Sequence, residues 1–216
     1  MFRKLIINTA KHETRVAMLE DGTIVELFIH RQQKLVRAEK YRQAGDNFMN
    51  ARQWKKAQSA YKKAVALCPD NVEYLSALGH SYYENFEAYK AYNIFKKNLN
   101  QHPNSPLALC DMGWIYSLLH RYVESEKALK KAIALQPDNK RARTLLGEVY
   151  RFGFKNYPAM WEQFNKVLEL DKNYQPVHLG IAEYYYEIRD YDKAIAKLKW
   201  ILENPTVADD LERIYI

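Results

Sequence analysis

The sequence predicts an all-α protein built from helix–turn–helix repeats, with a short β segment at its N-terminus. Two stretches nearly repeat each other: YKKAVALCPDN at residues 61–71 and LKKAIALQPDN at residues 129–139 agree in eight of eleven letters and lie 68 residues apart. A diverged copy, FKKNLNQHPNS at residues 95–105, lies halfway between them, which makes the period 34 residues. The 216 residues also include only 7 Gly and 7 Pro, too few for an all-β protein rich in tight turns.

The repeats follow one another with almost no gap. Aligning the chain on its period gives units at residues 38–71, 72–105 and 106–139. A fourth unit, 140–174, carries one extra residue, and a fifth spans 175–208, so the repeat region covers 35–208 and leaves a tail at 209–216. One unit cannot bury its own apolar face, but stacked units build a continuous core. We therefore expect an α-solenoid of about five repeats.

Each unit repeats one order of small and large side chains. A small residue stands at the eighth position and a ring follows three positions later. The small residues are Gly45, Gly79, Gly113, Gly147 and Ala182, and the rings are Phe48, Tyr82, Tyr116, Tyr150 and Tyr185. A small side chain at this point lets two antiparallel helices approach closely. Pro69, Pro103 and Pro137 then end the second helices, because proline lacks the backbone donor that a helix needs to continue.

These residues resemble the tetratricopeptide repeat (TPR) family. The resemblance covers residues 38–208 and rests on the small–aromatic–small–aromatic–proline order at the 34-residue period. The second helix also has a small residue in most units, at Ala57, Ala91, Ser125 and Ala194. Unit four departs most, since Met160 takes that second-helix position and Lys172 replaces the proline. We expect a wider helix crossing in that unit. Pro158 is expected in the first turn of its second helix, where the missing donor costs little.

The first residues of the chain follow another pattern. Leu5–Asn8, Arg15–Leu19 and Ile24–His30 are short β-type runs, and Glu20-Asp21-Gly22 predicts a hairpin turn between the second and third runs. We expect residues 1–34 to form a small β-meander. A meander this small needs another element to cover its apolar face.

The stretch ETRVAMLEDGTIVELFIHR, residues 13–31, resembles the extreme N-terminus of the ribonuclease E/G family. In that family the segment leads toward an RNA-binding barrel, whereas this chain continues into the first repeat. The family's barrel, its metal-binding carboxylates and its zinc-linking cysteine motif have no counterpart in the sequence, so no nuclease residue is assigned. Three roles stay open for residues 1–34: a cap on the repeats, a functional leader, or a fused remnant.

Catalytic motifs are absent from the sequence. No Gly-rich phosphate loop, GxSxG or HExxH occurs, and the six His are scattered without ligand spacing. Cys68 and Cys110 lie 42 residues apart, a spacing that supports neither a zinc site nor a disulfide framework and indicates a reducing, cytoplasmic setting. The pair Asp209–Asp210 in the tail is typical of a helix start. We expect a protein that is not an enzyme, with no cofactor, no metal site and no membrane partner.

The TPR resemblance implies a binding groove. In that family the first helices line a concave groove, and fixed repeat positions point into it. The residues expected there are Arg42, Met49, His80, Tyr83, Trp114, Leu118, Arg141, Arg151, Phe152 and Tyr186. Exposed aromatic and arginine side chains dominate binding hot spots. We therefore expect a non-catalytic protein–protein interaction scaffold or adaptor that binds a segment of a partner protein in this groove.

The alternative is an accessory role in RNA metabolism. It rests on the formal net charge of +7, on the ribonuclease-like leader, and on a basic cluster opposed locally only by Glu148. The cluster comprises Lys140, Arg141, Arg143, Arg151 and Lys155. Acids and bases alternate along most of the chain, which favours ordinary solvated helix faces over a nucleic-acid surface.

Overall fold

The structure is a computed structural model that describes residues 3–10, 13–20, 23–25 and 28–204, with side chains from residue 33 onward. The chain divides into two compact parts, Met1–Ile94 and Phe95–Ile216. From here on they are called the first and second units, and each 34-residue element of the sequence is called a repeat. The tail expected at 209–216, with Asp209 and Asp210, lies outside the described residues.

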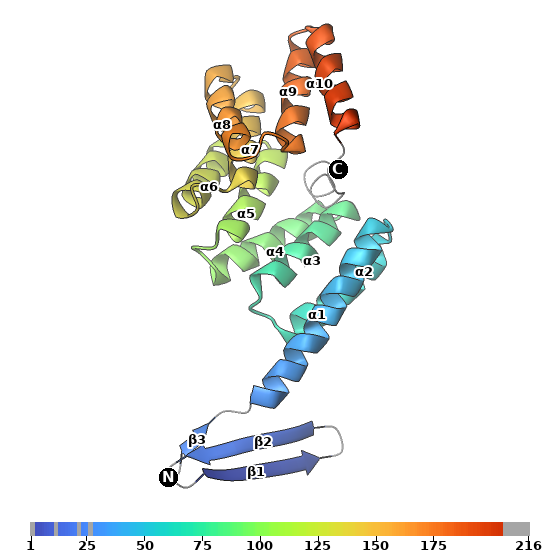
Figure 1. Cartoon of the computed structure of the whole chain (residues 1–216), viewed down its shortest axis with the longest axis vertical. Coiled ribbons are helices and arrows are strands. Elements are labelled where there is room, and N and C mark those ends of the chain that lie inside the picture. The colour runs from blue at the N-terminus through green and yellow to red at the C-terminus, as the bar shows by residue number, and fades with distance from the viewer. Residues whose placement is uncertain (1–2, 11–12, 21–22, 26–27, 205–216) are drawn as a thin grey trace. The chain divides into compact units, whose positions relative to one another are not determined.

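Three antiparallel strands precede the helices (Figure 1). They are β1 (Arg3–Ala10), β2 (Glu13–Glu20) and β3 (Thr23–Val25), in the order β1-β2-β3. Leu5 pairs with Met18, which in turn pairs with Val25. The hairpin turn expected at Glu20–Gly22 falls on residues 21 and 22, outside the described residues.

The third strand is shorter than the sequence predicted. A strand was expected over Ile24–His30, but β3 ends at Val25 and a helix begins at Phe28. The apolar residues Phe28 and Ile29 do not alternate with polar ones, and they run directly into the helix-forming stretch that follows. Extending an existing helix by a few residues costs far less than nucleating a new element.

Ten helices follow in the described part of the chain. Their bounds are α1 (Phe28–Asn50), α2 (Trp54–Leu67), α3 (Val72–Glu84), α4 (Ala88–Gln101), α5 (Pro106–Leu118), α6 (Tyr122–Leu135), α7 (Lys140–Phe152), α8 (Tyr157–Leu170), α9 (Gln175–Glu187) and α10 (Tyr191–Glu203). The pairs α1–α2, α5–α6, α7–α8 and α9–α10 pack closely. The first helices also meet one another, since α1 contacts α3, and α7 contacts both α5 and α9.

The predicted close approach of paired helices at glycine is confirmed. A Cβ placed on Gly113 in α5 would lie 2.6 Å from Leu129 Cγ in α6, and Leu129 is fully buried. Gly45 meets Tyr61 in the same way, and Gly147 meets Phe164. Met160 is fully buried beside Phe164. We expected a wider helix crossing in the fourth repeat, and this expectation is wrong for Gly147 and Phe164, which approach as closely as their counterparts. The flexible thioether side chain of Met160 fits into the core without separating the helices.

Side-chain caps and prolines mark the helix ends. Asn71, Ser105 and Asn139 accept hydrogen bonds from the backbone N–H groups of Tyr74, Ala108 and Ala142, at the starts of α3, α5 and α7. Such caps each stabilise a helix by about 1 kcal/mol. Pro158 lies in the first turn of α8, as predicted.

The turn inside each repeat contains a residue with positive φ. These residues are Arg52 (54°), Phe86 (61°), His120 (57°), Lys155 (51°) and Arg189 (63°). In the second repeat, the N–H of Phe86 donates to Tyr83 O and the N–H of Glu87 donates to Tyr82 O, a pattern that satisfies the last carbonyls of a helix. Glycine favours this backbone conformation, so its use by five larger residues could not be seen in the sequence.

Candidate functional site

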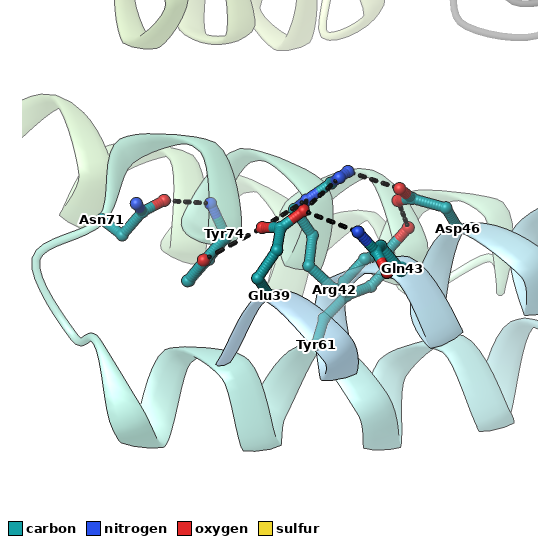
Figure 2. Close-up of polar contacts among 7 residues, drawn as sticks. All are labelled: Glu39, Arg42, Gln43, Asp46, Tyr61, Asn71 and Tyr74. Atoms are coloured by element: carbon teal, nitrogen blue, oxygen red, sulfur yellow. Dashed lines mark hydrogen bonds and ion pairs between the residues drawn. The ribbon is translucent and has the colours of Figure 1, made fainter. Parts of the chain in front are cut away.

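In the first unit, the predicted groove residue Arg42 belongs to a local network (Figure 2). Its guanidinium donates to Glu39 at 2.6–3.0 Å and also to Asp46. The hydroxyl of Tyr61 donates to Asp46 at 2.7 Å, and that of Tyr74 donates to Glu39 at 3.2 Å. The network joins α1 to α2 and α3. Hydrogen bonding to Arg42 lowers the pKa of Glu39, although partial burial opposes the shift.

In the second unit, Arg141 of α7 forms an ion pair with Asp111 of α5 at 2.8 Å. Asp111 is fully buried and the Arg141 side chain is 23% exposed. Cys110, next to Asp111, is also buried, and burial raises the pKa of its thiol to about 12. The thiol therefore stays protonated and unreactive at neutral pH.

The most concentrated set of charges lies between α7 and α9. Arg151 is 1% exposed and is surrounded by three carboxylates. Its guanidinium donates to Glu148 at 2.6 and 2.9 Å, to Glu187 at 3.2 Å, and also to Glu183. We call these four residues the Arg151 cluster. One cation among three acids leaves an excess of negative charge when all three are ionised.

Glycine makes room for the Arg151 cluster. A side chain at Gly180 of α9 would collide with Glu148 Oε1, so only glycine lets this carboxylate lie against the α9 backbone. Burial is the main cause that raises the pKa of Glu148 to about 7; Arg151 opposes this rise, and the neighbouring Glu183 and Glu187 contribute to it.

The raised pKa links the stability of the second unit to pH. An unfolded glutamate titrates near 4.3, so the folded state binds more protons between that value and about 7. The contribution of Glu148 to stability is therefore fully present below the unfolded pKa and is lost as pH rises through about 7. At about 1.4 kcal/mol per pKa unit, the full effect is of order 3 kcal/mol.

Two predicted groove residues are buried, against expectation. Trp114 is 9% exposed and packs edge-to-face on Phe95 with ring centroids 6.1 Å apart, so it belongs to the core. Arg151 is buried in its cluster. Repeat position shows in which direction a side chain leaves its helix, but it does not show whether a neighbouring helix covers that side chain.

The other predicted residues keep some exposure. In the second unit, Leu118 is 40% exposed, Phe152 46% and Tyr186 67%. In the first unit, Met49, His80 and Tyr83 are partly exposed. The Phe152 ring lies over the Arg151 guanidinium, with 3.8 Å from Arg151 Cζ to the ring centroid. Tyr186 contacts the ring of Tyr191, with centroids 5.7 Å apart.

The basic cluster expected at residues 140–155 is largely neutralised. Besides the pairs of Arg141 and Arg151, Lys140 forms an ion pair with Asp171 at 2.8 Å. The Arg143 guanidinium donates to Pro137 O at 2.8 Å and to Gln163 Oε1 at 3.1 Å. Glu148 is the one acid within residues 140–155, as expected, but acids from outside this stretch also oppose the cluster. The acids that do so come from α5, α9 and the α8–α9 turn, and so are separated in sequence from the bases.

Comparison with known proteins agrees with this geometry. Models of tetratricopeptide repeats match residues 45–85 and residues 106–139. The chain contains tetratricopeptide repeats. Neither matched region includes the N-terminal strands. Tetratricopeptide repeat protein 21A of Homo sapiens is 26% identical over 72% of this chain, which spans only 14% of that protein.

Solved structures show the same fold. A thermophilic TPR protein of Thermus thermophilus superposes with a TM-score of 0.71 at 17% identity, covering 78% of this chain and 91% of that one. The pilF protein of Pseudomonas aeruginosa gives 0.65 at 23% identity, covering 82% and 79%. A MamA protein gives 0.54 at 25% identity, covering 78% and 91%. The helical part of this chain is thus a TPR solenoid, a fold that is typically non-catalytic.

Two further observations bear on chemistry. Among the described residues, no group of three His, Cys, Asp or Glu side chains is placed to hold a metal ion. No helix in the described ranges has both the length and the apolar character needed to cross a membrane.

Proposed function

We propose that this protein is a non-catalytic scaffold whose TPR helices bind a segment of a partner protein. In the second unit, the segment is proposed to lie along α5, α7 and α9. The observation that carries the proposal is the pair of exposed rings, Phe152 and Tyr186, each of which is the sequence neighbour of a member of the Arg151 cluster. Exposed aromatic side chains beside buried polar anchors are the usual centres of protein interfaces.

The charge of this face narrows the chemistry of the partner. Arg151 is inaccessible at 1% exposure, whereas Glu183 is 37% exposed and Glu187 27%. A segment approaching Phe152 and Tyr186 therefore meets carboxylates rather than the arginine that was expected to bind it. We expect the bound segment to carry a basic side chain, since complementary charge sets orientation and excludes acidic partners.

Site-specific photocrosslinking in the native cell tests this proposal. A photoreactive phenylalanine analogue replaces Phe152 or Tyr186 in turn, and Leu170 of α8, which is 51% exposed on a second helix, serves as the control position. We expect both test positions to capture the same polypeptide and the control to capture none of it.

The captured segment then allows a measurement with purified components. Phe152→Ala and Tyr186→Ala should each weaken its binding by about 1–4 kcal/mol without loss of helical content. Glu183→Gln should reduce the affinity for the segment, and the reduction should be larger at low salt than at high salt. Unchanged affinity in both ring variants would refute the assignment of this face.

The RNA alternative receives no support at residues 140–155, because most of those cations are paired within the protein. The resemblance of residues 13–31 to ribonuclease E/G stays a prediction. We favour a cap on the repeats as the role of residues 1–34, since the terminal repeats of such proteins need a covered end.

A further inference from the structure

A separate basic surface lies on the first unit, at the turn between α1 and α2. Arg52, Gln53, Trp54, Lys55, Lys56 and Asn85 line an open cup of about 330 Å³. Three of these six side chains are cationic and none is acidic.

The charges of the cup are not neutralised from within the described part of the first unit. No acid lies within ion-pair distance of Arg52, Lys55 or Lys56 among the residues whose side chains are described. Arg52 is close enough to Glu84 to oppose the rise that burial causes in the pKa of that carboxyl. Lys56 lies 5.7 Å from the centre of the Phe48 ring, a contact that leaves its charge uncompensated.

The nearest acid to Asn85 is fully engaged elsewhere. Glu87 accepts hydrogen bonds from Asn85 at 2.6 Å, from Gln58 at 3.0 Å and from Lys90. These three donors, led by Lys90, lower the pKa of Glu87 to about 2. The carboxylate therefore stays ionised and is held by these three donors, of which only Asn85 lines the cup.

Three of the four other repeats pair a cation with an acid at the same place. The first residue before the second helix and the residue three positions later form the ion pairs Glu87–Lys90, Arg121–Glu124 and Asp190–Lys193. The equivalent residues in the first repeat are Gln53 and Lys56, so the acid is replaced by a neutral amide. The positive charge of this turn is thus a local property of the first repeat.

Aromatic side chains accompany these cations. Trp54 is partly buried and lines the cup. Phe86, next to Asn85, is 94% exposed, and Tyr89 at the start of α4 is 78% exposed. Phe86 also has a positive φ of 61°, a conformation that a bulky residue rarely adopts.

We propose that this cup binds single-stranded nucleic acid. Cations that contact phosphates, together with rings on which bases stack, are the two elements of sequence-tolerant single-strand recognition. A single strand fits this combination because its phosphates can contact the cations while a base stacks on Trp54. Gln53 adds an amide group that can hydrogen-bond to bases or sugars.

The test measures binding of a short fluorescein-labelled oligouridylate by fluorescence anisotropy at several salt concentrations. With three phosphate contacts, the logarithm of affinity should fall with the logarithm of salt with a slope of about −2. That slope predicts a loss of about 20-fold between roughly 50 and 200 mM salt. The triple variant Arg52→Gln, Lys55→Gln and Lys56→Gln should remove most of the binding and the salt dependence.

A matched control replaces three exposed lysines outside the cup: Lys96→Gln, Lys97→Gln and Lys199→Gln. This variant carries the same change in net charge and should bind like the native protein. Trp54→Ala should weaken binding by about 5- to 150-fold if a base stacks on the indole. Circular dichroism of each variant separates loss of binding from loss of folding.

Two results would overturn the proposal. One is equal loss of affinity in the cup variant and the control variant, which would show only non-specific attraction to net charge. The other is co-sedimentation with phosphatidylserine vesicles through these cations while oligouridylate does not bind, which would make the surface a membrane contact. A matching oligodeoxythymidylate shows whether the ribose hydroxyl contributes.

Discussion

Replacing Gly113 by alanine should destabilise the second unit, although alanine is the better helix former. The new Cβ would lie 2.6 Å from Leu129 Cγ and 2.7 Å from Cδ2, closer than such atoms approach in proteins. Leu129 is fully buried and cannot swing away. The two helices cannot easily slide apart either, because Ser125 Oγ of α6 donates to Gly113 O at 2.6 Å.

The expected magnitude follows from two opposing effects. Overpacking a core costs about 1–3 kcal/mol. Alanine recovers about 1 kcal/mol of helix propensity relative to glycine. The net loss should therefore be about 0–2 kcal/mol for Gly113→Ala, and larger for Gly113→Leu. Because repeats are coupled mainly to their neighbours, the loss should appear as partial melting around α5 and α6.

A second substitution makes the prediction sharp. Leu129→Ala removes the atoms that the new Cβ would strike and leaves a cavity beside Gly113. In that background, Gly113→Ala should stabilise the protein by about 1 kcal/mol, since only the propensity gain and some cavity filling remain. The change of sign gives a coupling energy within the range of about 0.5–3 kcal/mol typical of contacting residues.

Urea denaturation followed by circular dichroism measures the four stabilities of this cycle, and hydrogen exchange in α5 and α6 localises the change. Stabilisation by Gly113→Ala in the native background would refute the argument, because it would mean that the helices leave room for a methyl group at this crossing.

Three further predictions concern the second unit. Between about pH 5 and 8, the free energy of unfolding should fall as pH rises through the raised pKa of Glu148. Urea titrations at each pH measure this dependence, and Glu148→Gln should make it weaker. An unchanged pH dependence in the variant would assign the effect to another group. Arg151→Met should destabilise α9 and α10 by about 3–5 kcal/mol at pH 8, because it leaves the buried Glu148 carboxylate without its cation, and by less at pH 5, as hydrogen exchange can show; equal losses at both pH values would contradict the charge argument. Asn139→Ala should cost about 1 kcal/mol by removing the cap of α7, whereas Asn139→Asp should cost little, and thermal melts of the two variants make the comparison.

The period of the sequence predicted most of the helical architecture, because one physical constraint recurs in every repeat. Gly113 and Leu129 must meet for two helices to cross closely, and a small residue and a large apolar residue recur at these two positions. The boundary between β3 and α1 was harder to predict from the sequence. Phe28 and Ile29 read as strand from composition, and only their continuity with the helix-forming residues after them places them in α1.

The candidate site was predicted less well, for a reason visible in single residues. Arg151 and Phe152 are neighbours in sequence and both were expected in the groove, yet one is buried and the other is 46% exposed. The difference depends on Glu183 and Glu187, which lie 32 and 36 residues away. The partners of Lys140 and Arg141 are equally remote. The local sequence shows which side chains are charged. Whether a charge is neutralised depends on side chains that are remote in the sequence, which the local sequence does not show.

The two partners of each link are separated by a similar number of residues, and this similarity has a consequence for folding during protein synthesis. The polar links between first helices span 35 residues for Tyr74 and Glu39, 30 for Arg141 and Asp111, and 32 for Arg151 and Glu183. Every such link therefore closes a loop of about one repeat, and the entropy of closure does not grow along the chain. On the ribosome, a repeat can complete its links as soon as the next one has emerged. Folding can thus keep pace with translation, and each new repeat exposes its apolar face only for the time needed to make its successor.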